Sequence, residues 1–231
     1  MNSPSRGRYV TWADWVFNPW VSGVRTVASS HGEWVSDDEA MSPGDPADAI
    51  AWDRDAEGFA RETGRRRRVF AGPWCRVFDA GAVPSEREAF WQLVRQTPSL
   101  DWLVLLDSTS DASLLLPHEW PRGFHNVWLG VKVSGGSAAS DITALRRVPA
   151  HLRFLLAAPL LDDLGDLDLV GIDWVVLCAQ PVERHEFDIV ASVRLQCAAY
   201  GVPCWFEDTD HKGALANAGA TWQQEPKRRA V

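Results

Sequence analysis

Three side chains of this sequence could carry out acid–base chemistry together: Lys132, Asp107 and Glu207. Asp107 and Lys132 directly follow short apolar runs, and Glu207 follows a third. A lysine held among apolar groups gives up its proton more readily, and a nearby carboxylate can then exchange that proton with a bound molecule. The same groups could instead form an ion pair that fills the pocket and carries out no chemistry. We favour this second interpretation.

Four further residues stand at or near the same positions and predict a binding pocket: Trp20, Trp74, Cys178 and His31. Cys178 could act as a nucleophile if a base generated its thiolate. Its sequence neighbours are apolar, so a packed core thiol is the favoured interpretation. Trp74 could stack on a planar ligand, but it could also simply fill a cavity.

Short continuous apolar runs must position these residues. Such runs are typical of strands buried on both faces of a parallel sheet. They occur at residues 16–20, 69–71, 102–106, 127–131, 152–156, 174–177 and 202–206. Their spacing of about 25 residues predicts an α/β fold, a partial (β/α) barrel of about six to seven mostly parallel strands. A doubly wound sheet remains an alternative, and in either case a ligand site is expected beyond the carboxyl ends of the strands.

Helices are expected between these runs, over residues 85–95, 138–147 and 186–200. Ser85 and Glu88 have the spacing of a capping box at the start of the first helix. We treat residues 1–231 as one barrel-like domain. Residues 35–68 would form an acidic, turn-rich insertion, and residues 208–231 a partly frayed tail. The run Arg65–Arg68 could bind an anion, but a solvated face leading into the next strand is the favoured interpretation.

The composition excludes several classes of function. The net charge of -8 argues against nucleic acid as the main partner, since binding phosphates needs a local excess of Lys and Arg. The four cysteines include no closely spaced pair, which argues against a disulfide framework or a CxxC metal site. No apolar stretch approaches the length of a membrane span or a signal peptide. We therefore expect a soluble, cytoplasmic, tryptophan-rich protein that is not bound to a membrane.

The order of many short motifs resembles a phage-associated family of radical-SAM-like proteins that carry a three-cysteine motif. The shared motifs run along nearly the whole chain: Thr11-Trp12, Asn18-Pro19-Trp20, Arg68-Val69-Phe70, Val83-Pro84, Thr97-Pro98, Asp101-Trp102-Leu103, Leu116-Pro117, Asn126 to Val131, Val148-Pro149-Ala150, Arg153-Phe154-Leu155, Pro159-Leu160-Leu161, Gly171 to Val175, Gln196-Cys197 and Gly201-Val202-Pro203. The resemblance implies a partial (β/α) barrel, in agreement with the strand pattern.

This chain departs from that family at the residues that would do the chemistry. The resemblance implies three cysteines that hold a [4Fe–4S] cluster, and those positions fall on Gly23, Ser30 and Glu33. Iron–sulfur clusters are held mainly by thiolates, which these side chains cannot supply. The glycine- and glutamate-containing segment that the resemblance places after residue 176 reads Leu177-Cys178-Ala179-Gln180-Pro181. The motifs implied for the scaffold remain, while those implied for the cofactor are replaced.

We therefore expect a cluster-less, radical-SAM-like barrel protein without radical-SAM activity and without a cofactor. It would act as a binding or partner protein, with a protein partner or a small-molecule ligand. The alternative is an enzyme repurposed for non-redox acid–base or cyclisation chemistry at the strand-end pocket.

Overall fold

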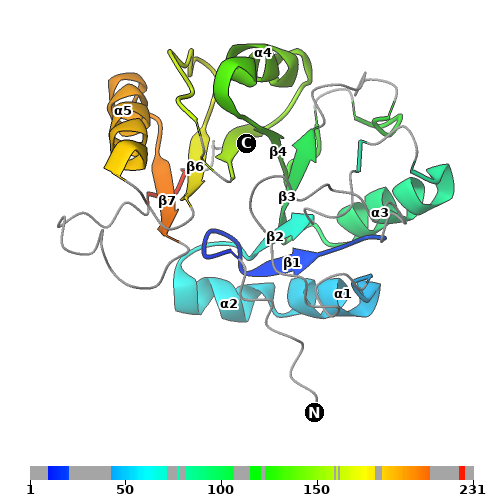
Figure 1. The fold of residues 1–231 in the computed structure, drawn as a ribbon. Coiled ribbons are helices and arrows are strands. Elements are labelled where there is room, and N and C mark those ends of the chain that lie inside the picture. The colour runs from blue at the N-terminus through cyan, green and yellow to red at the C-terminus, as the bar shows by residue number, and fades with distance from the viewer. Residues whose placement is uncertain are drawn as a thin grey trace. The chain divides into compact units, whose positions relative to one another are not determined.

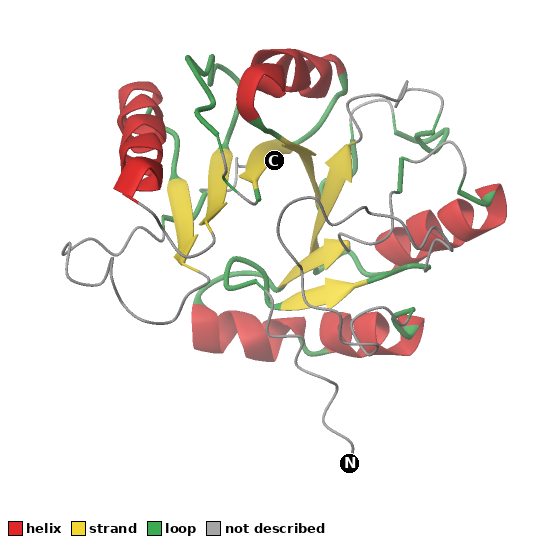
Figure 2. Cartoon of the chain, viewed as in Figure 1, coloured by secondary structure: helices red, strands yellow, loops and turns green. Residues whose placement is uncertain are grey.

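The structure is a computed structural model. It describes residues 10–20, 43–71, 77–78, 82–106, 115–120, 123–158, 160, 162–179, 184–208 and 224–226. Helices are interspersed with strands along this part of the chain (Figures 1 and 2). None of the helices within it is long and apolar enough to cross a membrane.

Seven strands form one sheet in which the spatial order is the order of the sequence. The strands are β1 (Trp15–Phe17), β2 (Arg68–Ala71), β3 (Asp101–Leu106), β4 (Val127–Lys132), β5 (Leu152–Ala157), β6 (Trp174–Ala179) and β7 (Cys204–Asp208). The pairs β1–β2, β2–β3, β5–β6 and β6–β7 are parallel. This is the strand order of a partial (β/α) barrel, so the predicted α/β fold class is confirmed. A doubly wound sheet, whose strand order reverses, is excluded.

Five α-helices connect or precede the strands: α1 (Pro46–Arg54), α2 (Ala56–Thr63), α3 (Pro84–Gln96), α4 (Ala138–Arg147) and α5 (Arg184–Tyr200). A short 3-10 helix, η3 (Gly135–Ser137), leads into α4. Helices α1 and α2 lie within the segment that the sequence predicted to be a turn-rich insertion.

The predicted capping box of α3 is wrong. The helix begins at Pro84, its N-cap is Val83, and no side chain bonds to the free N–H groups of the first turn. Proline is favoured at this first helical position because its φ angle is already helical and it has no N–H to satisfy. Ser85 therefore lies inside the helix, and Glu88 accepts hydrogen bonds from Gln92 and Arg95 instead.

The chain divides into two compact units. The first comprises Met1–Trp128 and Pro149–His151, and the second Leu129–Val148 and Leu152–Val231. Aromatic packing forms the core of the first unit. Trp102 on β3 is fully buried and meets Phe17 and Phe90 edge-on, with ring centroids 5.5 Å apart in each pair. Trp15 on β1 stacks on Trp52 of α1 at 4.7 Å.

The core of the second unit includes a row of rings across β5, β6 and β7. Trp174 lies 6.4 Å from Phe154 and 6.2 Å from Trp205 between ring centroids. Phe154 occupies the space beside Gly130 on β4, where an added Cβ would lie 2.3 Å from the ring. Gly130 is therefore needed for a close approach between side chain and strand.

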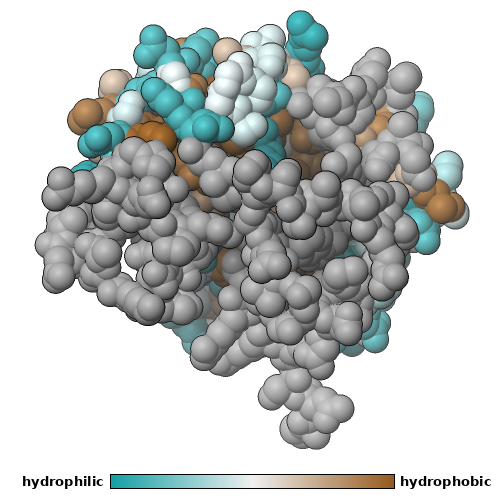
Figure 3. All heavy atoms as spheres, viewed as in Figure 1, coloured by the Kyte–Doolittle hydropathy of each residue, from teal (hydrophilic) through white to brown (hydrophobic). Residues whose placement is uncertain are grey.

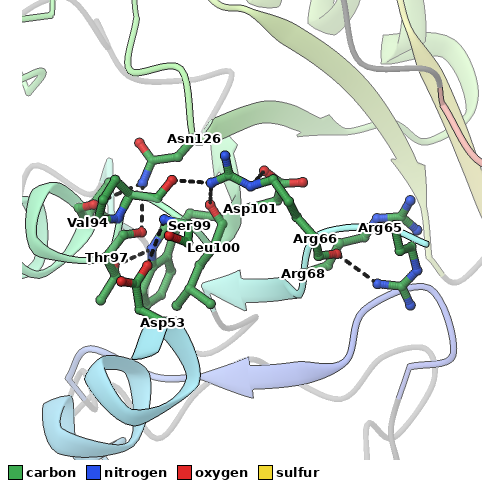
Figure 4. A network of polar contacts seen from close by, with 12 residues as sticks. Asp53, Arg65, Arg66, Arg68, Val94, Thr97, Ser99, Leu100, Asp101 and Asn126 are labelled. Atoms are coloured by element: carbon green, nitrogen blue, oxygen red, sulfur yellow. Dashed lines mark hydrogen bonds and ion pairs between the residues drawn. The ribbon is translucent and has the colours of Figure 1, made fainter. Parts of the chain in front are cut away.

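The four arginines from Arg65 to Arg68 each contact a different partner in the first unit, so the prediction of a solvated face is wrong for part of this run. Arg65 binds both carboxylate oxygens of Asp14, at 2.7 and 2.9 Å. Arg66 pairs with Asp101 at 3.1 Å and donates to the carbonyl of Leu100 (Figure 4).

The other two arginines are buried. Arg67 pairs with Asp55 at 3.1 Å and lies over the ring of Phe59. Arg68 lies 5.1 Å from the ring centroid of Trp128 and is only 3% exposed. A guanidinium tolerates burial when carboxylates and aromatic rings replace its water shell.

Candidate functional site

Four of the predicted site residues fall in the part of the chain that the structure describes: Trp20, Lys132, Cys178 and Glu207. The other predicted positions, Asp107, Trp74, His31, Gly23, Ser30 and Glu33, lie outside the described residues. Trp20 belongs to the first unit and is buried. Lys132, Cys178 and Glu207 all belong to the second unit, so their arrangement can be followed there.

Cys178 and Glu207 are brought together directly. They are register partners on the adjacent parallel strands β6 and β7, so their side chains project from the same face of the sheet. The Cys178 thiol donates a hydrogen bond to Oε2 of Glu207 over 3.5 Å. Both residues are buried, with exposed fractions of 3% and 7%. The sequence placed both residues at strand ends but did not predict this contact.

The face that carries this pair is the one opposite α5. Val175 on β6 is the register partner of Cys204 on β7. Cys197 of α5 raises the pKa of Cys204, which places the Cys204 side chain on the side of this helix. Successive residues of a strand point to opposite faces, so residues an odd number of positions apart lie on different faces. Cys178 and Glu207, which lie an odd number of residues from Val175 and Cys204, therefore face away from α5.

Lys132 lies on the same face as Cys178 and Glu207. It follows Gly130 by two positions on β4, and Gly130 faces the ring of Phe154. Phe154 is in turn the register partner of Trp174. Cys178 lies four positions after Trp174 on β6 and therefore on the same face. The Lys132 residue is exposed. Strands β5 and β6 separate β4 from β7, so Lys132 and Glu207 are three strand spacings apart along the sheet, about 14 Å.

The neighbouring carboxylate argues against Cys178 as an activated nucleophile. An ionised carboxylate beside a thiol disfavours the thiolate, because two negative charges would then share a site of low dielectric. Reactive cysteines usually lie in electropositive, partly exposed surroundings instead. The thiol of Cys178 serves as a hydrogen-bond donor that satisfies a buried carboxylate, in agreement with the predicted packed role.

The chain after β5 borders the same edge of the sheet. Ala158 directly follows β5 and is buried, and the backbone N–H of Leu160 donates to the carbonyl of Cys178 at 2.8 Å. This bond satisfies the carbonyl beside the thiol–carboxylate pair. The chain that follows β5 is thus hydrogen-bonded to β6 at the residue that carries the thiol.

A glycine-rich loop after β4 is a second feature of this edge that our sequence analysis missed. Ser134 and Ser137 flank Gly135 and Gly136, and the signal in the sequence is the segment SGGS between an apolar run and a helix. The Ser137 hydroxyl bonds to the Ser134 carbonyl at 2.9 Å and to Asp141 at 2.7 Å. These contacts hold the loop at the start of α4.

The residues present do not fit a [4Fe–4S] cluster. The three positions implied by the resemblance carry no thiol, and thiolates are the ligands that such clusters need. The three described cysteines are free and buried, on β6, α5 and β7. Within the described ranges, no group of three or more His, Cys, Asp or Glu side chains could hold a metal ion.

Comparison with known proteins gives one match, to a family model described as "Protein of unknown function (DUF5131)", over residues 8–225. No curated protein and no solved structure matches the chain. Because the match covers almost the whole sequence, the protein belongs to the DUF5131 family.

Proposed function

We propose that this protein is a cluster-less, radical-SAM-like barrel that acts as a binding protein and has no radical-SAM activity. The observation that carries the proposal is the buried contact between Cys178 and Glu207 at the carboxyl ends of β6 and β7. Ligands of parallel α/β sheets bind beyond these strand ends. At this edge the Cys178 thiol and the Glu207 carboxylate are hydrogen-bonded to each other. This arrangement favours neither a reactive thiolate nor metal binding.

The sequence supports the same conclusion from another side. Gly23, Ser30 and Glu33 stand where the resemblance implies cluster ligands. Without the cluster, S-adenosylmethionine has no iron at which to be reduced. The barrel and its strand-end edge remain as a surface for a small molecule or a protein partner.

An iron–sulfur reconstitution tests the absence of the cluster. The full chain would be purified and incubated with iron and sulfide under anaerobic conditions, and its bound iron and acid-labile sulfide measured. We expect the amounts of bound iron and acid-labile sulfide to be no higher than in a protein that has no thiol ligands for a cluster. Stoichiometric iron and sulfide, with the visible absorption of a cluster, would refute the proposal.

The matched control is the variant Gly23→Cys/Ser30→Cys/Glu33→Cys, which restores the three thiols in the implied pattern. It reports whether the reconstitution conditions load a cluster on this scaffold when ligands are present. Iron bound by this variant but not by the natural chain would assign the difference to those three side chains.

Binding at the strand ends is tested by thermal shift and calorimetry, with S-adenosylmethionine as the first probe and a panel of small metabolites as the second. A ligand that binds the folded state raises the melting temperature in proportion to its occupancy. Glu207→Gln removes a charge at the edge while keeping the side-chain size. A ligand seated there loses affinity in this variant, whereas a ligand bound elsewhere does not.

The alternative, a non-redox enzyme, is favoured by one observation: Lys132 and Glu207 share a face of the sheet. A lysine used as a general base needs a pKa lowered towards neutrality. The measurement is the pH dependence of reductive methylation at Lys132, followed by NMR. A methylation rate that rises near neutral pH favours the enzyme, and one that rises only near the ordinary pKa of lysine favours the binding protein.

A further inference from the structure

A short segment near the C-terminus, residues 224–226, lies against the edge of β7. This strand is the last in the order of the sheet, and it lies beside β6 (Figure 1). Within the part of the chain that the structure describes, no further strand lies beyond it. The contact is at the start of β7, whereas Glu207 lies near its end, so this inference is independent of the proposed function.

Gln224 binds both backbone groups of Cys204. Its side-chain Oε1 accepts a hydrogen bond from the Cys204 N–H at 3.2 Å, and its own N–H donates to the Cys204 carbonyl at 3.1 Å. The carbonyl of Pro203, one residue earlier, accepts from Val175 on β6. Successive residues of a strand direct their backbone groups to alternate sides, so the N–H and carbonyl of Cys204 point away from β6. A neighbouring strand would bind these same two groups.

The carbonyl of Gln224 is bound to a second strand. It accepts a hydrogen bond from the indole N–H of Trp174, the first residue of β6, at 2.9 Å. Trp174 is fully buried, and a buried indole N–H needs an acceptor. Gln224 therefore has three hydrogen bonds to two adjacent strands, although it is distant from both in the sequence.

The two residues after Gln224 are unsuited to continue a strand. Glu225 is exposed and carries a charge, and Pro226 is buried and has no backbone N–H. Charged residues and proline at a sheet edge both disfavour the addition of another strand. The segment can therefore cover the edge of β7 without offering a new edge of its own.

The composition of β7 explains why this edge needs a cover. The strand begins Cys204-Trp205-Phe206, three buried apolar residues of the kind that form strands readily. An uncovered apolar edge is a template for pairing with another chain. Every copy of the chain carries the same edge, so two copies can pair β7 with β7 in antiparallel orientation about a two-fold axis. A second copy is therefore the partner that an open edge would take.

We propose that residues 224–226 act as an edge cap, an intramolecular segment that prevents a second copy of the chain from adding to the sheet at β7. Gln224 is the central residue of the cap, because it binds the two backbone groups that strand addition would use. Release of the cap converts the edge of β7 into a dimer interface.

The test compares full-length variants at position 224 by sedimentation velocity over a range of protein concentrations. Gln224→Pro removes both the side-chain acceptor and the N–H donor, and Gln224→Ala removes the acceptor alone. We expect association to increase from the natural chain to Gln224→Ala and further to Gln224→Pro. Gln224→Glu is the matched control, since it keeps an acceptor oxygen at the same place and should sediment as the natural chain does.

Hydrogen exchange of the Cys204 amide, followed by NMR, assigns the association to this edge. In dilute, monomeric samples the amide should exchange about tenfold faster in Gln224→Ala than in the natural chain, the effect of losing one hydrogen bond. In the associated form of Gln224→Pro it should be protected again, because the second copy then accepts the bond.

Three results would each overturn the proposal. The first is a Cys204 amide that exchanges in the natural chain as fast as an exposed amide, a measurement that does not depend on the folding of any variant. The second is equal association of the natural chain and Gln224→Pro. The third is association of Gln224→Pro that leaves the Cys204 amide unprotected, which would place the interface on another surface.

Discussion

Gly130 and Gly136 lie in or near the same strand, yet they have different reasons to be glycine. An added Cβ at Gly130 would lie 2.3 Å from the Phe154 ring, whereas one at Gly136 would meet nothing within 4 Å. Neither residue has a positive φ. The constraint at Gly130 therefore comes from packing and not from backbone conformation.

We predict that Gly130→Ala lowers the free energy of unfolding by about 1–3 kcal/mol, the usual cost of overpacking a core. Gly136→Ala is the control, and its effect should stay within about 0.5 kcal/mol. Guanidinium denaturation of both variants measures the difference. Equal stabilities would contradict the close approach of Phe154 to β4.

Asp168 shows how an exposed ion pair sets a local pKa. A hydrogen bond from the Arg146 side chain at 2.7 Å is the main cause that lowers the pKa of Asp168, and the Val170 N–H adds to it. Because the folded-state pKa lies below the unfolded value, the stabilisation is present above the ordinary aspartate pKa and is lost as the pH falls through the folded-state value.

Arg146→Gln should therefore raise the pKa of Asp168 towards its ordinary value. NMR titration of the Asp168 carboxyl group measures this shift. The stability difference between this variant and the natural chain should be small, because the pair is exposed, and should shrink at acidic pH. An unchanged Asp168 titration would contradict the assigned cause.

At the scale of the elements, the C-terminal end of α3 is stabilised by a residue from outside the helix. The last carbonyls of a helix have no partner within it. Here the Asn126 amide, just before β4, donates to the carbonyl of Val94 at 2.9 Å and to that of Thr97 at 3.2 Å (Figure 4). Thr97 also accepts a hydrogen bond from the indole of Trp102. The Asn126 side chain thus joins the end of α3 to the residue before β4, and the Thr97 hydroxyl links the same helix end to β3.

Asn126→Ala should lower the free energy of unfolding by about 2–3 kcal/mol, because it leaves buried carbonyls without a donor. Thr143→Ala is the control, since its hydroxyl bonds to the Ala139 carbonyl at an exposed position of α4, and it should change stability by less than about 0.5 kcal/mol. Urea denaturation compares the two. A loss below 1 kcal/mol for Asn126→Ala would show that water replaces the amide.

At the scale of the whole molecule, two features are relevant: the described cysteines are buried, and polar and apolar residues are mixed at the surface. Hydrophilic and hydrophobic residues lie intermixed on the described part of the face in Figure 3. The most exposed large apolar residues, Leu195, Val170, Val83 and Tyr200, come from separate segments except for the two on α5. The cysteines Cys178, Cys197 and Cys204 are all buried.

We predict that a reduced Cys75→Ser variant has no rapidly reacting thiol in native buffer. Labelling with a bulky maleimide should be slow and should accelerate with denaturant, because each thiol reacts only after the chain opens. The natural chain is the control and differs by the thiol at position 75. Rapid labelling of the variant in native buffer would contradict the burial of the three cysteines.

The sequence by itself determined where the strands lie, while the order of the strands in the sheet was decided by the structure. Continuous apolar runs mark strands covered on both faces, and local patterns of this kind need no information about distant residues. All seven predicted runs overlap observed strands, and the helix predicted over residues 138–147 matches α4. The same reasoning placed Cys178 and Glu207 at strand ends.

Only the tertiary structure decided which side chains meet. The pairing of Cys178 with Glu207 depends on the register between β6 and β7, and a shift of one residue would have placed them on opposite faces. The Val202 N–H reaches the Cys197 carbonyl because a left-handed glycine, Gly201, reverses the chain between helix and strand. Arg67 and Arg68 are buried against Asp55 and Trp128, which lie in other segments of the chain. Each of these contacts joins residues whose positions are set by packing, a property that composition and spacing do not contain.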